Sequence, residues 1–161
     1  MLQNHPPCLR IEKSVLKSEQ RKGGVHMDNE KLIEIAMDEM EKSYAPYSHY
    51  LQAAALEAED GTIYTGCKVE NASYPMTASA EAVAFYKAVS EGKRNFRKIA
   101  LVGGSEGKIT DYCLPSGDSR QVMLEFCNPM TFEVILATSP EDYKVYALEE
   151  LMPLYFGPKH R

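Results

Sequence analysis

The sequence lacks several features that would assign its 161 residues to a class at once. It has no apolar run long enough to cross a membrane, and its N-terminus lacks the continuous apolar stretch of a secretory signal. It also lacks an excess of positive charge, because its formal net charge is -5. Surfaces that bind nucleic acid or anionic membranes need clustered positive charge. We therefore expect small-molecule or protein partners, with no nucleic acid and no membrane, and a cytoplasmic location.

Cysteine is scarce and scattered in this sequence. The four cysteines are Cys8, Cys67, Cys113 and Cys127, and no two of them have C-x-x-C spacing. In a reducing compartment, such isolated cysteines are typical of free thiols. The pattern predicts no disulfide framework.

The length and the hydrophobic content of 44% are sufficient for one packed core, but the chain is too short for two domains that each have a packed core. Residues 1–26 contain Pro6-Pro7, Gly23-Gly24 and five basic residues, without sustained apolar periodicity. This composition predicts a disordered tail, followed by a folded domain over residues 27–161. Met1 and Met27 are both candidate starts of translation.

Apolar periodicity and turn residues predict an α/β fold. We expect helices over residues 28–44, 79–91 and 116–127, with one helical turn over 148–151. We expect strands over residues 50–57, 62–69, 98–102, 132–138 and 143–146. Asp60-Gly61 predicts a hairpin between the first two strands, and Gly103-Gly104 is expected to end the third. The order of elements predicts a mixed sheet with helices on both faces.

Two short segments hold the candidate chemistry: Ser79-Ala80-Glu81 and Pro115-Ser116-Gly117-Asp118-Ser119. Zinc nucleobase deaminases carry His or Cys, any residue, then Glu, and further on Pro-Cys-x-x-Cys. The same spacing occurs here, with serine at all three ligand positions. A serine hydroxyl stays protonated and is a poor zinc ligand compared with a thiolate. The pattern therefore predicts that no metal is bound and that Ser79, Ser116 and Ser119 are former metal positions.

Longer segments resemble the small homotetrameric cytidine deaminases, from about Tyr44 to Pro158. The segments that carry the resemblance are Ala45–Ser48, Gly66–Tyr74, Lys87–Gly92, Ser119–Val122, Leu151–Pro153 and Phe156–Pro158. The resemblance implies a three-layer α/β/α cytidine-deaminase-like fold with a five-stranded mixed sheet. It also implies that the helices bearing the three serines lie on one face with their N-termini in the pocket. A homotetramer is the implied assembly.

The resemblance also implies roles for individual residues. Glu81 is the candidate acid and base that moves protons between water, the ring nitrogen and the leaving amine. Tyr50 is expected to stack near the base. Glu70 is expected to bind ribose hydroxyls together with an asparagine two residues earlier, but that position is Lys68 here. The implied substrate-binding set is Tyr50, Lys68, Glu70, Ala80, Tyr74 and Phe156, of which Tyr74 and Phe156 serve a neighbouring subunit.

Other positions depart from the family pattern. Ala82 stands where relatives have an arginine, and Leu51-Gln52 replaces a smaller pair. Ordinary structural roles are also open: Ser79 and Ser116 as helix caps, Glu81 as a first-turn glutamate favoured by the helix dipole, and Lys68 as a solvated strand-end lysine.

These observations lead to one main functional hypothesis and two alternatives. The main hypothesis is a cytidine-deaminase-like pseudoenzyme that has lost its zinc site and binds a nucleoside or nucleotide without deaminating it. One alternative is a zinc-independent hydrolase that uses Glu81, and the other is an ordinary cytidine deaminase. Under the main hypothesis, water or a small anion occupies the serine cluster at the two helix N-termini. A carboxylate of Glu81 or Asp118 folded back onto those N-H groups would exclude the anion.

Overall fold

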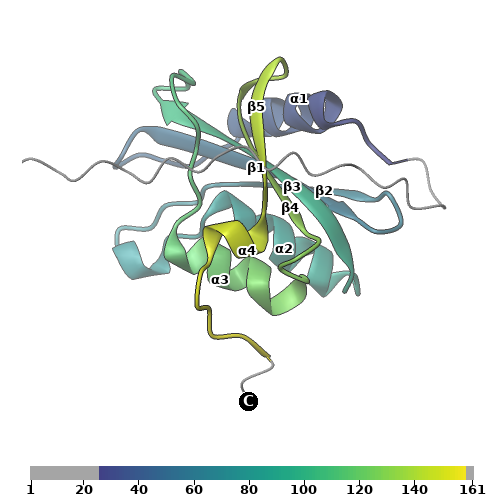
Figure 1. Ribbon diagram of the computed structural model, residues 1–161. Coiled ribbons are helices and arrows are strands. Elements are labelled where there is room, and N and C mark those ends of the chain that lie inside the picture. The colour runs from purple at the N-terminus through teal and green to yellow at the C-terminus, as the bar shows by residue number, and fades with distance from the viewer. Residues whose placement is uncertain (1–25, 159–161) are drawn as a thin grey trace, which may run out of the picture.

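A mixed sheet of five strands, in the order β2-β1-β3-β4-β5, forms the centre of the molecule (Figure 1). The computed structural model describes residues 26–158, so residues 1–25 of the predicted tail lie outside the described part. The strands are β1 (Tyr50–Ala58), β2 (Ile63–Cys67), β3 (Phe96–Ser105), β4 (Glu133–Ser139) and β5 (Asp142–Ala147). Only the β3 and β4 pair is parallel, and the other three neighbouring pairs are antiparallel.

Helices cover both faces of the sheet, which confirms the predicted three-layer α/β/α fold. Figure 1 shows α1 (Asn29–Met40) on one side, with α2 (Ala80–Ser90), α3 (Gly117–Phe126) and the short α4 (Leu148–Leu151) on the other. A 3-10 turn, η1 (Tyr74–Met76), precedes α2. Alternate residues of β1 enter two separate cores: Ala53 and Ala55 face α1, whereas Ala54 and Leu56 face α2. This alternation follows from the two-residue period of a strand.

Two glycines occupy positions that favour glycine for different reasons. Gly61 adopts a positive φ of 84° in the turn between β1 and β2, so the predicted hairpin is confirmed. Gly66 of β2 lies directly under α2, where an added Cβ would be 2.3 Å from the Ala80 carbonyl oxygen. Only glycine allows this close approach, and it sets the N-terminal turn of α2 close against β2.

Two predicted boundaries are wrong. The helix predicted to reach residue 44 ends at Met40, because Tyr44 forms a bridge to Val69 and donates its N-H to the Lys68 carbonyl at 2.9 Å. The strand predicted to end before the glycine pair continues through Gly103 and Gly104, which pair with β1. Pairing across the sheet therefore overrides the local preference of glycine for turns. Within residues 26–158, no helix is long and apolar enough to cross a membrane.

Candidate active site

The three serines at the motif positions come together at the N-termini of α2 and α3. Ser119 Oγ donates to Ser79 Oγ at 3.1 Å and lies 3.1 Å from Ser116 Oγ. Ser79 is the N-cap of α2 and accepts from the Ala82 N-H at 3.3 Å. Ser116 is the N-cap of α3 and accepts from the Ser119 N-H at 3.2 Å. The hydroxyls therefore cap both helices and bond to one another, as serine at an N-cap commonly does.

Glu81 lies in the first turn of α2 next to these hydroxyls, and its exposed fraction is 0%. Burial raises the pKa of its carboxyl group above the ordinary value. Hydrogen bonds from its own backbone, Ser79, Ser119 and Gln52 act in the opposite direction without overcoming burial. A raised pKa makes a carboxyl group a stronger base and allows it to carry a proton at higher pH than an exposed glutamate does. Asp118, by contrast, is exposed and is not folded back onto the buried cluster.

Gln52 is a site residue to which the sequence analysis assigned no role. It was noted only as part of the Leu51-Gln52 pair, which departs from the family pattern. It projects from β1, and its Nε2 donates to both Glu81 oxygens at 3.2 and 3.1 Å. Its own backbone is fixed by Ser43, which bonds to the Gln52 N-H and carbonyl. The available signal was a glutamine within a largely apolar strand, because a polar side chain buried there needs a hydrogen-bond partner.

A pocket of about 560 Å³ opens beside this cluster. Two of the three serines, Ser79 and Ser116, line it together with Gln52, Lys68 and residues of the segment before α2. The full lining is Gln52, Lys68, Pro75, Met76, Thr77, Ala78, Ser79, Ala82, Tyr86, Ser116, Asp118 and Val122. A cavity of this size, with a few convergent polar groups, is typical of a small-molecule site.

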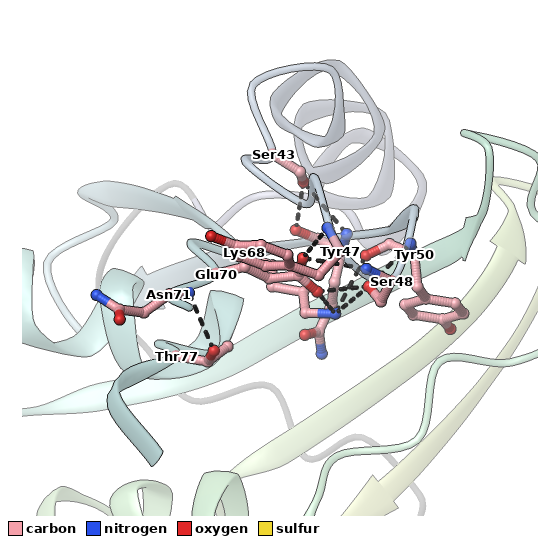
Figure 2. A network of polar contacts seen from close by, with 9 residues as sticks. Ser43, Tyr47, Ser48, Tyr50, Lys68, Glu70, Asn71 and Thr77 are labelled. Atoms are coloured by element: carbon pink, nitrogen blue, oxygen red, sulfur yellow. Dashed lines mark hydrogen bonds and ion pairs between the residues drawn. The ribbon is translucent and has the colours of Figure 1, made fainter. Parts of the chain in front are cut away.

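Lys68 and Glu70 lie side by side after the end of β2, with Ser48 close to both (Figure 2). Lys68 Nζ is 2.9 Å from Glu70 Oε1, and it also donates to Ser48 Oγ and to the Tyr50 carbonyl. Glu70 accepts from the backbone N-H groups of Tyr47 and Ser48. The Ser48 hydroxyl and the Lys68 ammonium lower the pKa of Glu70 to about 2.

Tyr50 and Cys113 form the side of the site next to Glu81. Lys68 Nζ lies 5.6 Å from the centre of the Tyr50 ring, within the range of a cation-π contact. Burial raises the pKa of the Tyr50 hydroxyl, which therefore stays protonated at neutral pH. Burial, with a contribution from Glu81, raises the pKa of the Cys113 thiol to about 11. Cys113 is therefore a neutral thiol here, without the nucleophilic character of a thiolate.

The remaining predicted substrate-binding residues are Ala80, Tyr74 and Phe156. The side chain of Ala80 is in the hydrophobic core, so only its backbone can face a ligand. Tyr74 is 70% exposed on η1, beside Pro75 and Met76, which line the pocket. Phe156 is 61% exposed near the C-terminal end, where its carbonyl accepts from Gln121 on α3.

Comparison with known proteins identifies the fold and the family. A family described as the cytidine and deoxycytidylate deaminase zinc-binding region matches residues 1–112. The chain is 45% identical over 131 residues to a cytidine deaminase of Sporosarcina psychrophila, covering 81% of this chain and 93% of that protein. It is 39% identical over 127 residues to one from Halalkalibacterium halodurans, covering 79% and 92%. The chain belongs to the cytidine deaminase family.

A solved structure agrees with this assignment. The crystal structure of cytidine deaminase from Burkholderia pseudomallei matches with a TM-score of 0.74 and 40% sequence identity. The match covers 81% of this chain and all of that one. The predicted resemblance and the predicted fold class are both confirmed.

The same findings contradict the main functional hypothesis. The hypothesis of a non-deaminating pseudoenzyme rested on Ser79, Ser116, Ser119 and Ala82, whereas the similarity to cytidine deaminases extends over most of the chain. The prediction that zinc is absent is contradicted as well, because the matching family is defined by a zinc-binding region. Zinc is the cofactor that family membership leads us to expect.

The converging residues of this chain differ in kind from the usual zinc donors. Zinc sites in proteins use thiolate, imidazole or carboxylate ligands, and Ser79, Ser116 and Ser119 offer neutral hydroxyl oxygens. Among residues 26–158, no group of three or more His, Cys, Asp or Glu is placed to hold a metal ion. The three serines therefore do not fit zinc as thiolates would, and the chemistry below is assigned only to groups of this chain.

Proposed function

We propose that the chain is a cytidine deaminase, which converts a cytidine-type nucleoside and water into the uridine-type nucleoside and ammonia. The observation that carries the proposal is Glu81, a fully buried carboxyl group with a raised pKa beside a pocket of ligand size. Its place in a chain 45% identical to a cytidine deaminase supports the same reaction.

In the proposed reaction, water adds to C4 of the cytosine ring and the exocyclic amine leaves as ammonia. Glu81 takes a proton from the attacking water and returns protons to the ring nitrogen and to the leaving amine. Gln52 donates to both carboxylate oxygens, and Ser79 and Ser119 also hydrogen-bond to Glu81. Because Glu81 is fully buried, its carboxyl group is held away from bulk water.

The base is proposed to lie between Glu81 and the ring of Tyr50, with the sugar directed towards Lys68 and Glu70. Tyr50 is half-buried and follows Ser48, whose side chain belongs to the Lys68 and Glu70 network. This orientation places the reacting end of the ligand at the convergence of the two helices. The sugar then faces the only basic residue that lines the described pocket.

The direct test is product analysis with purified protein. Cytidine should be converted to uridine with release of one ammonia per turnover, at a rate proportional to protein concentration. Elemental analysis of the same sample measures the zinc bound per chain. If the parent protein forms uridine no faster than the Glu81→Gln variant does, the proposal is overturned.

We also propose that the chain assembles as a homotetramer. Tyr74, Phe156 and Tyr86 are more than half exposed, as are Met76 and Leu114. Exposed large apolar side chains beside a pocket favour a protein interface, and Tyr74 and Phe156 are the residues that the family resemblance assigns to a neighbour's site. Light scattering at micromolar concentration should give four times the chain mass, and a monomer would contradict the assembly.

A cytoplasmic location and a domain boundary near residue 27 complete the proposal. Cys67, Cys113 and Cys127 are free thiols in the structure, which is compatible with a reducing compartment. His26 and Met27 already contact buried Glu57 of β1, so ordered packing extends to the proposed boundary.

A further inference from the structure

A buried pair of opposite charges holds the main chain of Met27, just before α1. Glu57 of β1 and Lys98 of β3 are register partners in the sheet, and their side chains are 0% and 6% exposed. Glu57 Oε1 accepts from the Met27 N-H at 3.2 Å, and Lys98 Nζ donates to the Met27 carbonyl at 2.5 Å. Burying charged groups is costly, so an arrangement that directs both of them to one backbone residue calls for an explanation.

The acceptor capacity of Glu57 is only partly used. Its Oε1 contacts the Met27 N-H and His26 Nδ1, the latter at 3.1 Å. Its Oε2 is buried and has no hydrogen-bond partner among residues 26–158. Lys98 Nζ lies 3.6 Å from this oxygen, which is beyond hydrogen-bond range. Because an unpaired buried oxygen is rare and costly, a donor that reached both oxygens from the side of the Met27 nitrogen would stabilise the site.

An α-ammonium group on Met27 would be such a donor. A peptide nitrogen carries one hydrogen, whereas an ammonium group carries three and a positive charge. One hydrogen would keep the bond to Glu57 Oε1, and a second would serve Oε2 of the same carboxylate. The third would face a pocket of about 330 Å³ whose wall includes Met27, Asn29 and Lys98.

The charges around this pocket also favour an added cation. The charged residues of its wall are Asp28, Glu30, Arg97 and Lys98, and Glu57 forms an ion pair with the last of them. Three of these five residues are acidic and two are basic, so together they carry one net negative charge. An α-ammonium group would neutralise that charge. Its bond to a buried carboxylate would be charge-assisted and therefore stronger than a bond from a neutral peptide N-H.

We infer that Glu57 is the receptor for the amino terminus of a chain that begins at Met27, and that Met27 is the start of the functional protein. The inference does not depend on the proposed deaminase function. The length of a relative agrees with it, because 81% of this chain matches the whole of the Burkholderia pseudomallei protein. Both hydrophobic cores consist of residues at or after Met27, so residues 27–161 contain what is needed to fold.

The test is thermal unfolding of four proteins: residues 1–161 and residues 27–161, each with Glu57 and with Glu57→Gln. Residues 27–161 should have the higher Tm, because only that chain places an ammonium group beside Glu57. Glu57→Gln should lower the Tm of residues 27–161 by at least about 3 °C more than it lowers that of residues 1–161, since an amide cannot pair with a cation.

Two controls keep the inference open to refutation. Acetylation of the amino terminus of residues 27–161 removes the charge and two of the three hydrogens without changing the core. It should lower the Tm of that chain, and it replaces Glu57→Gln as the test if that variant does not fold. Glu34→Gln is the matched substitution, because Glu34 pairs with Lys31 on the exposed face of α1. It should change the Tm of the two chains equally.

Equal effects of Glu57→Gln in the two chains, or an acetylated chain as stable as the free one, would overturn the inference. The mass of the protein isolated from its own cells is an independent check. It should correspond to a chain that begins at Met27, and a mass that includes residues 1–26 would also overturn the inference. None of these measurements uses deaminase activity, so their failure is distinguishable from failure of the proposed function.

Discussion

Glu81 and Glu70 are two glutamates of the same site whose pKa values shift in opposite directions. Both side chains are nearly inaccessible to solvent, but Glu81 has only neutral partners, and burial raises its pKa. Glu70 has a serine hydroxyl, a lysine ammonium and two backbone N-H groups, which lower its pKa to about 2. The difference shows that burial alone does not decide ionisation. A permanent positive charge within hydrogen-bond distance separates a structural carboxylate from one suited to proton transfer.

Changing the neutral partners of Glu81 into anionic ones is the largest change that the site allows. In the triple variant Ser79→Cys, Ser116→Cys and Ser119→Cys, the converging hydroxyls become thiols that ionise on zinc binding. Thiolate zinc sites contribute about 10–16 kcal/mol of apparent binding free energy. We therefore expect zinc affinity to rise by about 10⁴-fold or more over the parent, as measured by competition with a chromophoric chelator.

A control separates site geometry from the mere addition of thiols. It carries cysteine at three exposed serines that do not converge: Ser73, Ser90 and Ser105. This control should bind zinc no more tightly than the parent. Equal affinity of the two triple variants would show that the three motif positions do not form a preorganised metal site.

Removing the proton-carrying group itself should have the next largest effect. Glu81→Gln keeps the shape and the contact with Gln52 but cannot accept a proton, so kcat for cytidine should fall by about 10²–10⁴-fold. The decrease in absorbance as cytidine is converted to uridine measures this directly. Glu34→Gln, on the exposed surface of α1, is the control and should leave kcat unchanged. A Glu81→Gln variant with more than half of the parental kcat would remove Glu81 from the mechanism.

Replacing the donor that holds Glu81 should have a moderate effect. Gln52→Leu removes the two bonds from Nε2 while preserving approximate volume, so the carboxylate loses both its orientation and a group that lowers its pKa. We expect kcat to fall by about tenfold with a smaller change in KM. Gln52→Glu retains the length but places a second carboxyl group against Glu81, so it should be worse than leucine. Activity equal to the parent in both variants would show that Gln52 does not position Glu81.

The smallest expected effect is on stability, and it should differ in sign between the two glutamates. Glu70 has a folded-state pKa of about 2, below the unfolded value of about 4.3, so its stabilisation is present above pH 4.3 and is lost as pH falls towards 2. Glu81 has a raised folded-state pKa, so stability decreases as pH rises above about 4.3 until that carboxyl group is ionised.

Thermal unfolding from pH 3 to pH 8 measures both effects. Relative to the parent, the Tm of Glu81→Gln should increase progressively as pH rises above about 4.3. The decrease in Tm caused by Glu70→Gln should become smaller as pH falls from 5 to 3. Parallel pH profiles for the parent and both variants would contradict the opposite shifts.

The sequence predicted most of the fold because its local signals agreed with the tertiary arrangement. Asp60-Gly61 marked the hairpin, and the periodic apolar residues placed α1, α2 and α3 within a few residues of their observed bounds. The two boundary errors have one cause. Tyr44 and Gly103-Gly104 are paired to strands that are remote in sequence, and no local pattern reports such pairing.

The candidate site was partly predictable. The motif spacing identified Glu81 and the three serines, which the structure brings together as expected. The functional conclusion drawn from the serines was wrong because it weighed three ligand positions above similarity along the whole chain. Gln52 received no role, because its partner Glu81 is 29 residues away and only the packing of α2 on the sheet brings the two into contact.

The order of helices and strands, the helix-capping serines and the glutamate of the motif could all be identified from the sequence, because they depend on spacing along the chain. Which carboxyl group is held by a cation, and which by neutral donors, depends on the folded arrangement. Lys68 and Glu70 are two residues apart, but the bonds that saturate them come from the loop of Tyr47 and Ser48. Ionisation depends on distance in space and on burial, and the fold sets both.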